Sequence, residues 1–125
     1  MKKYLVVAGL LLLFSSCYND KYDRLYPMVV NPCDTTTITY AKDIQPIIAA
    51  NCFKPGSGCH DVAGTSGINF ETSITSLQGY AASGVLLGDI NWHTGYNPMP
   101  KGGAKMSDCE INKITRWVHL GALNN

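Results

Sequence analysis

The stretch Cys52-Phe53-Lys54-Pro55-Gly56-Ser57-Gly58-Cys59-His60 carries two cysteines, and a histidine follows the second one directly. A cysteine pair that ends in Cys-His is the form in which chains attach haem covalently, usually written C-x-x-C-H. The thiols bind the two vinyl groups, and the neighbouring imidazole reaches the iron as proximal ligand. Here six residues separate the cysteines instead of two, and their proline and glycines are expected to turn the chain back. The stretch therefore predicts one covalent haem c per chain, bound through Cys52 and Cys59, with His60 on the iron.

The segment Tyr40–Cys52 is expected to form the helix that delivers Cys52 to this site. Asp43 is a suitable N-cap, and Pro46 then falls in the first turn, where its missing N–H does no harm. An apolar side follows at helical spacing, and it consists of Ile44, Ile47, Ile48 and Ala50. A plain amphipathic helix with a buried cysteine is the alternative interpretation.

A second chemical stretch is Tyr96–Gly103, in which Met99 lies between two prolines. Flanking prolines hold a residue in an extended loop with few conformers, so the thioether can point at iron without a large ordering cost. Met99 is therefore predicted as the distal ligand, which raises the haem potential relative to histidine ligation. The competitors are Met106, which is expected to pack beside a helix start, and His93, which would give a bis-histidine haem. His119 is expected on the outer side of the last helix.

The clearest helix of the sequence is Ser107–Gly121. Ser107 and Glu110 form the pattern of a capping box, and Gly121 is expected as the C-cap. The apolar stripe of this helix consists of Ile111, Ile114, Trp117 and Val118.

The middle of the chain gives weaker signals. Residues 61–69 are glycine-rich and are expected to be irregular, and residues 72–78 are expected to form a short helix. A loop is expected at residues 80–84. The apolar segment 85–92 is expected to be helical, with a buried strand as the alternative.

The first residues have the pattern of an export signal. Two lysines precede an apolar run from Tyr4 to Phe14, which is shorter than the roughly 20 residues of a membrane span. Leu13-Phe14-Ser15-Ser16-Cys17 resembles a bacterial lipobox, so residues 1–16 are expected to be removed and Cys17 to be acylated. An ordinary signal peptide with a chance cysteine is the alternative. The expected organisation is a signal peptide at 1–16, a lipid-anchored linker at 17–32 and a folded domain at 33–125.

Charge and cysteine content narrow the function further. Loss of the two N-terminal lysines turns the formal net charge from +1 to −1, and no clustered basic face predicts nucleic-acid binding. With Cys17 on lipid and Cys52 and Cys59 on haem, Cys33 and Cys109 remain for a disulfide, which an oxidising compartment allows. A haem-free chain with two disulfides accounts for the five cysteines equally well. The number of cysteines therefore does not distinguish the haem-binding scheme from the haem-free one.

The order of these motifs resembles small monohaem c-type cytochromes. It is similar in particular to exported, lipid-anchored cytochrome domains of Bacteroidetes-type bacteria, whose haem motif often has an expanded spacer. The resemblance covers about residues 33–125 and implies Cys52 and Cys59 on the haem vinyls, with His60 proximal and Met99 distal. It implies a small all-α, cytochrome c-like domain with long irregular loops, in which the N- and C-terminal helices pack beside the haem. The residues that carry it are Ile-Gln-Pro-Ile-Ile from Ile44, Cys-His, Met-Pro and Ser-x-x-Glu-Ile-x-x-Ile-x-x-Trp-Val from Ser107.

The expected function is one-electron transfer in the cell envelope, by an outer-membrane lipoprotein facing the periplasm or the cell surface. Six-coordinate iron has no open position, so the chain is expected to be an electron carrier and not an enzyme, with redox proteins as partners and no small-molecule substrate. Peroxidase-like chemistry would need Met99 to leave the iron. The main alternative is a haem-free, disulfide-stabilised lipoprotein that acts as a binding module. A zinc site is a weaker alternative, because a second Cys/His pair at ligand spacing is missing.

Overall fold

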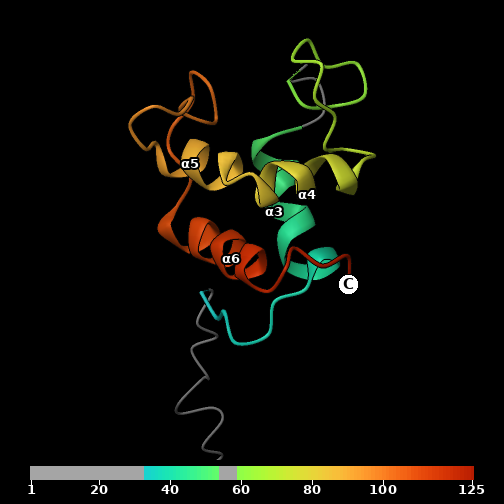
Figure 1. Ribbon diagram of the computed structural model, residues 1–125, viewed down its shortest axis with the longest axis vertical. Coiled ribbons are helices and arrows are strands. Elements are labelled where there is room, and N and C mark those ends of the chain that lie inside the picture. Colours follow the sequence, from blue (N-terminus) through green and yellow to red (C-terminus); the bar gives the residue numbers. More distant parts are fainter. Residues whose placement is uncertain (1–32, 54–58) are drawn as a thin grey trace, which may run out of the picture. The chain divides into compact units, whose positions relative to one another are not determined.

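A computed structural model describes residues 33–53 and 59–125 of the chain (Figure 1). The predicted signal peptide, Cys17, the linker and the turn at 54–58 lie outside the described residues. Helices are the regular elements of the described part, which contains no strand, and this confirms the all-α expectation. None of these helices is long and apolar enough to cross a membrane. The elements are η2 (Tyr40–Ile44, a π-helical turn), α3 (Gln45–Asn51), α4 (Ile74–Ala82), α5 (Val85–Asn91) and α6 (Asp108–His119).

The first helix begins earlier than its predicted cap. Thr39 is the N-cap, because its hydroxyl accepts a hydrogen bond from the N–H of Lys42 at 3.4 Å. Asp43, which the sequence predicted as the cap, lies inside the helix and accepts a hydrogen bond from the N–H of Thr39 at 3.0 Å. The prediction was wrong because Thr39 and Asp43 bond reciprocally, and this arrangement adds η2 in front of α3. Pro46 lies in the first turn of α3, as expected.

The buried side of this helix also differs by one residue from the prediction. Ile44 and Ile48 are fully buried, but Ala50 is exposed, and Ala49 packs against the core instead. The reason is helical geometry, since a residue two positions after Ile48 lies roughly 200° around a helix of 3.6 residues per turn.

The two central helices join through a tight glycine turn. α4 begins after the N-cap Ser73 and continues to Ala82, so the loop predicted at 80–84 was wrong for its first three residues. The helix continues because Ala81 is buried in the core. Gly84, with a φ of 79°, then turns the chain directly into α5. The helical prediction for residues 85–92 is confirmed up to Asn91, Trp92 is the C-cap with a φ of 61°, and the strand alternative is wrong.

The capping box predicted for the last helix is present in the structure. The Ser107 hydroxyl accepts a hydrogen bond from the N–H of Glu110 at 3.3 Å, and the Glu110 carboxylate accepts one from the N–H of Ser107 at 2.9 Å. The C-cap is Leu120, one residue before the predicted Gly121. Gly121 follows with a φ of 92°, the left-handed conformation that commonly comes just after a helix end.

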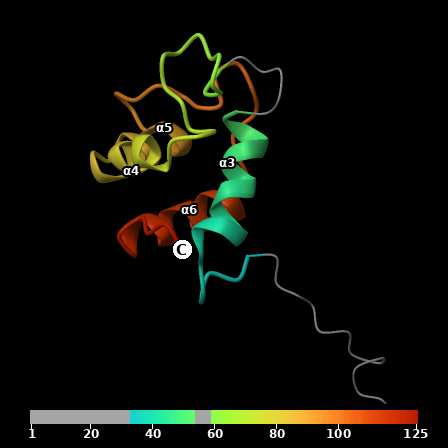
Figure 2. The ribbon, with the colours of Figure 1, turned by 90° about the vertical axis from the view of Figure 1, so that its right-hand side faces the viewer.

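The first and last helices of the domain cross each other (Figure 2). At one end of the crossing the Lys113 ammonium lies 3.7 Å from the Asp43 carboxylate. At the other end the Asn51 amide donates to the Glu110 carboxylate at 3.1 Å. These contacts hold Cys52, at the end of α3, in a defined position relative to α6.

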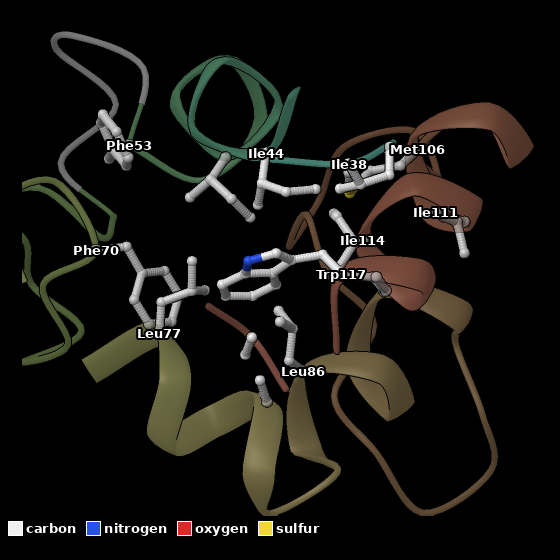
Figure 3. Packing of buried hydrophobic residues seen from close by; sticks show 14 residues of the cluster. Ile38, Ile44, Phe53, Phe70, Leu77, Leu86, Met106, Ile111, Ile114 and Trp117 are labelled. Atoms are coloured by element: carbon white, nitrogen blue, oxygen red, sulfur yellow. The ribbon is translucent and has the colours of Figure 1, made fainter. Parts of the chain in front are cut away.

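One hydrophobic core lies under all of the helices, and Trp117 is at its centre (Figure 3). The Trp117 side chain is 1% exposed, and its indole N–H donates to the carbonyl oxygen of Leu123 at 2.8 Å. Met106 is also part of this core, which confirms that it packs beside the start of α6. The helices contribute Ile44, Ile48, Leu77, Leu86, Ile90, Ile111 and Ile114, and residues outside the helices contribute Ile38, Phe53 and Phe70.

Protonation of the Glu110 carboxylate in acid is expected to weaken the hydrogen bonds that hold α3 and α6 together where they cross. Burial alone would raise the pKa of this carboxyl, but hydrogen bonds from Ser107 and Asn51 outweigh it and lower the pKa. The stability that these bonds contribute is therefore complete above the unfolded-state pKa of about 4.3 and is lost as the pH falls through the folded-state pKa. On acidification below about pH 4.3, the free energy of unfolding of the wild type should fall more steeply than that of Glu110→Gln.

Urea denaturation of both proteins across this pH range measures the difference. Glutamine keeps one oxygen that can accept from Ser107 but cannot also accept from Asn51, so its absolute stability is expected to be lower. The change of stability with pH, which glutamine cannot produce by titrating, is therefore the quantity to compare. Parallel pH profiles for the two proteins would contradict the assignment.

Candidate cofactor site

A cavity of about 480 Å³ lies among the end of α3, the loop at 59–73, α5 and the loop at 92–107. Both loops lie at the same end of the helices in the two ribbon views (Figures 1 and 2). The volume is within the roughly 300–1,000 Å³ of sites that hold small molecules and cofactors. Its apolar lining comprises Ile68, Phe70, Tyr80, Val85, Leu86 and Ile90.

All four residues predicted to hold a haem line this cavity. They are Cys52, Cys59, His60 and Met99. The first three come from the motif at the end of α3, whereas Met99 comes from the loop after α5. The structure thus brings together two chemical stretches that lie far apart in the sequence.

Cys52 and His60 lie close together, while the turn predicted at 54–58 lies outside the described residues. Cys52 is the C-cap of α3, and its carbonyl oxygen accepts a hydrogen bond from the N–H of His60 at 3.2 Å. Burial and then the nearby Cys59 thiolate raise the pKa of Cys52 to about 12. The Cys52 thiol therefore stays protonated at neutral pH.

The imidazole of His60 is held from two sides. Its ring stacks on Phe70 with a centroid distance of 4.9 Å and an angle of 25° between the planes. Its Nδ1 atom lies 3.1 Å from the hydroxyl oxygen of Ser66. The Phe70 and Tyr80 rings pack edge to face with a centroid distance of 5.6 Å, so Tyr80 of α4 supports Phe70 in turn. The other ring nitrogen of His60, Nε2, is the one left to bind a metal in the cavity.

The loop that carries Met99 is fastened to α5 and its C-cap through the backbone. The N–H of Met99 donates to the carbonyl oxygen of Asp89 at 3.1 Å, and its own carbonyl oxygen accepts from the Trp92 indole at 2.8 Å. The Asp89 carboxylate also accepts a hydrogen bond from the N–H of Asn97 at 2.9 Å. The position of the thioether therefore depends on Asp89 and Trp92, to which no motif of the sequence pointed.

Two glycines allow neighbouring chain segments to approach closely around the cavity. A Cβ atom on Gly64 would lie 2.2 Å from the carbonyl oxygen of Cys59, and one on Gly88 would lie 2.2 Å from the Tyr96 ring. Both separations are far shorter than van der Waals contact. The only signal for Gly64 in the sequence was the glycine content of residues 61–69, which predicted an irregular loop without saying which glycine is needed.

The alternative ligands lie elsewhere in the fold. Met106 is 5% exposed and belongs to the core, and His93 and His119 are exposed. None of the three is among the described residues that line the cavity. His60 and Met99 are therefore the histidine and the methionine that reach the cavity from the described part of the chain.

The predicted disulfide partners, Cys33 and Cys109, are neighbours. A hydrogen bond with the Cys33 side chain raises the pKa of the Cys109 thiol, with burial as the next cause. This contact joins the start of the domain to the first turn of α6. The disulfide itself stays a prediction.

Comparisons of the chain with family models, with curated proteins and with solved structures gave no match. Within residues 33–53 and 59–125, no group of three or more His, Cys, Asp or Glu side chains could hold a metal ion by itself. The zinc alternative therefore has no support in this part of the chain.

The residues that line the cavity fit a haem. The motif at the end of α3 supplies two thiols and an imidazole, the loop after α5 supplies a thioether, and the lining between them includes a set of aliphatic and aromatic side chains. Thiol, imidazole and thioether are the groups by which chains attach a porphyrin and ligate its iron.

Proposed function

We propose that this protein binds one haem c covalently and transfers single electrons. The observation that carries the proposal is that Cys52, Cys59, His60 and Met99 line one cavity although two distant stretches of the chain supply them. The thiols of Cys52 and Cys59 would tether the cofactor. The imidazole of His60 and the thioether of Met99 would occupy the two axial positions of its iron.

The chain's own residues favour electron transfer over substrate chemistry. A bound haem would supply a one-electron exchange between ferric and ferrous iron. With both His60 and Met99 bound to the iron, no ligand position would remain for oxygen or peroxide, which argues against an enzyme. Phe70 and Ile90 line the cavity and would exclude water from the cofactor. The crossing of α3 and α6 agrees with a cytochrome c-like arrangement of terminal helices.

The proposed setting is the cell envelope of a bacterium. Export, acylation of Cys17 and a linker at 17–32 would anchor the domain at the outer membrane. Its partners would be redox proteins of the envelope, and no nucleic acid or small-molecule substrate is proposed.

One observation favours the haem-free alternative. Cys33 is in contact with Cys109, and Cys59 lies close enough to Cys52 to influence its pKa. Two disulfides between these pairs would stabilise an envelope lipoprotein that acts as a binding module.

Mass measurement of the mature protein, produced with haem-attachment machinery, separates the two functions. We expect the mass of one haem to remain on the denatured chain, and sharp visible absorption bands to appear on reduction. Reduction should also add two hydrogens, at Cys33 and Cys109. A Cys52→Ser, Cys59→Ser double variant should lose the covalent haem. A wild-type chain without haem that gains four hydrogens on reduction would overturn the proposal.

A further inference from the structure

We propose that Ser66 is a positioning residue that holds the neutral imidazole of His60 in one tautomer, with the proton on Nδ1 and the lone pair on Nε2. The role of this tautomer in binding iron rests on the proposed function. The tautomer itself follows from the hydrogen bonds of the Ser66 hydroxyl and does not depend on haem.

The Ser66 hydroxyl has four polar neighbours. The carbonyl oxygen of Cys59 lies at 2.6 Å, Nδ1 of His60 at 3.1 Å, the N–H of Ile68 at 3.2 Å and the carbonyl oxygen of Ile68 at 3.3 Å. A hydroxyl has one hydrogen to donate and two lone pairs with which to accept. Which neighbours accept from the hydroxyl and which donate to it therefore decides whether Nδ1 of His60 carries a proton.

The shortest contact determines where the hydroxyl hydrogen goes. A carbonyl oxygen only accepts, so the hydroxyl must donate in the 2.6 Å contact to Cys59. The carbonyl of Ile68, at 3.3 Å, is the weaker competitor for the same hydrogen. The two lone pairs are then left for the N–H of Ile68 and for Nδ1 of His60. Nδ1 must carry a proton to make its contact.

This arrangement prepares Nε2 as a ligand. A neutral imidazole with its proton on Nδ1 has its lone pair on Nε2, and an acceptor at Nδ1–H orients the ring and increases its basicity. Phe70 keeps the ring plane in place by stacking. Because the same hydroxyl is bonded to the carbonyl of Cys59, the orientation of His60 is coupled to the backbone of the adjacent attachment cysteine.

Nitrogen NMR of the His60 ring in the haem-free protein, at a pH where the ring is neutral, tests the tautomer. We expect the Nδ1–H form to dominate in the wild type. In Ser66→Ala the ratio of Nδ1–H to Nε2–H should fall about fivefold, which is the effect of one net hydrogen bond. Ser66→Thr keeps a hydroxyl and should retain the wild-type ratio. Ser83→Ala removes a hydroxyl that donates to the Tyr80 carbonyl, and should leave the ratio unchanged. A wild-type ring in the Nε2–H form would overturn the proposal, whatever happens to the variants.

The reduction potential of the haem-loaded protein tests the consequence. Loss of the Ser66 acceptor makes His60 a weaker electron donor, so ferric iron is less stabilised and the potential of Ser66→Ala should shift upwards. Ser66→Thr and Ser83→Ala should keep the wild-type potential. An unchanged potential in Ser66→Ala would overturn the role of Ser66 toward iron. A wild type that takes up no haem would overturn the proposed function alone, since the NMR result stands without it.

Discussion

Replacement of Met99 by alanine should lower the reduction potential of the haem and let carbon monoxide bind the ferrous iron. The thioether is the proposed distal ligand, and methionine raises the potential relative to other axial arrangements. The shift should be on the order of 0.1 V, a fraction of the roughly 0.8 V that axial ligands span. The hydrogen bonds to the Met99 backbone, from Trp92 and to Asp89, do not involve its side chain, so the loop should keep its place. Potentiometric titration and a carbon monoxide difference spectrum measure the two effects.

Met106→Ala is the matched control. Met106 is 5% exposed in the core, so its truncation should destabilise the domain by about 2–5 kcal/mol without a change in the axial ligands. His93→Ala tests the remaining competitor and should leave the spectrum unchanged, because His93 is exposed and is not among the described lining residues. If Met99→Ala kept the wild-type spectrum while one of these two variants lost it, the distal assignment would be wrong.

Substitution of Gly64 by alanine should sharply reduce covalent haem attachment and destabilise the domain. The new methyl carbon would lie 2.2 Å from the carbonyl oxygen of Cys59 and 2.8 Å from its carbonyl carbon. Backbone atoms cannot rotate away as a flexible side chain can, so residues 59 and 60 would have to move together. Overpacking of this kind costs about 1–3 kcal/mol or more, and the displacement would fall on the attachment thiol and the proximal ligand. The ratio of haem to protein and urea denaturation report the two effects.

Gly79→Ala provides the opposite case. Gly79 lies inside α4, and apart from its chain neighbours and the backbone of its own helix, a Cβ atom there would meet no described atom within 4 Å. Alanine is the better helix former, so this variant should gain about 0.5–1 kcal/mol and attach haem like the wild type. Equal haem content in the two alanine variants would show that the close approach at Gly64 is not needed for the site.

Local patterns were enough to predict most of the helices. Ser107 and Glu110 predicted the start of α6 because a capping box uses only neighbouring residues, and Pro46 marked a first turn because proline lacks an N–H. Two errors were local, since Thr39 caps the first helix in place of Asp43 and Ala50 lies on the exposed side of its helix, but the end of α4 depended on distant contacts. α4 continues past its predicted end because Ala81 is buried in the core, and no local signal in the sequence reports that burial.

The chemical candidates were visible in the sequence itself, because Cys-His after a cysteine and a methionine between prolines are short contiguous motifs. The fold decided which methionine lies at the cavity and which lies in the core, since that choice depends on how α5 and its loop pack against the other helices. It also decided the supporting contacts of Ser66 to His60, of Gly64 to Cys59 and of Trp92 to Met99. These contacts join side chains or backbone groups across turns, with no periodic spacing to reveal them, so they appear only when the chain is folded.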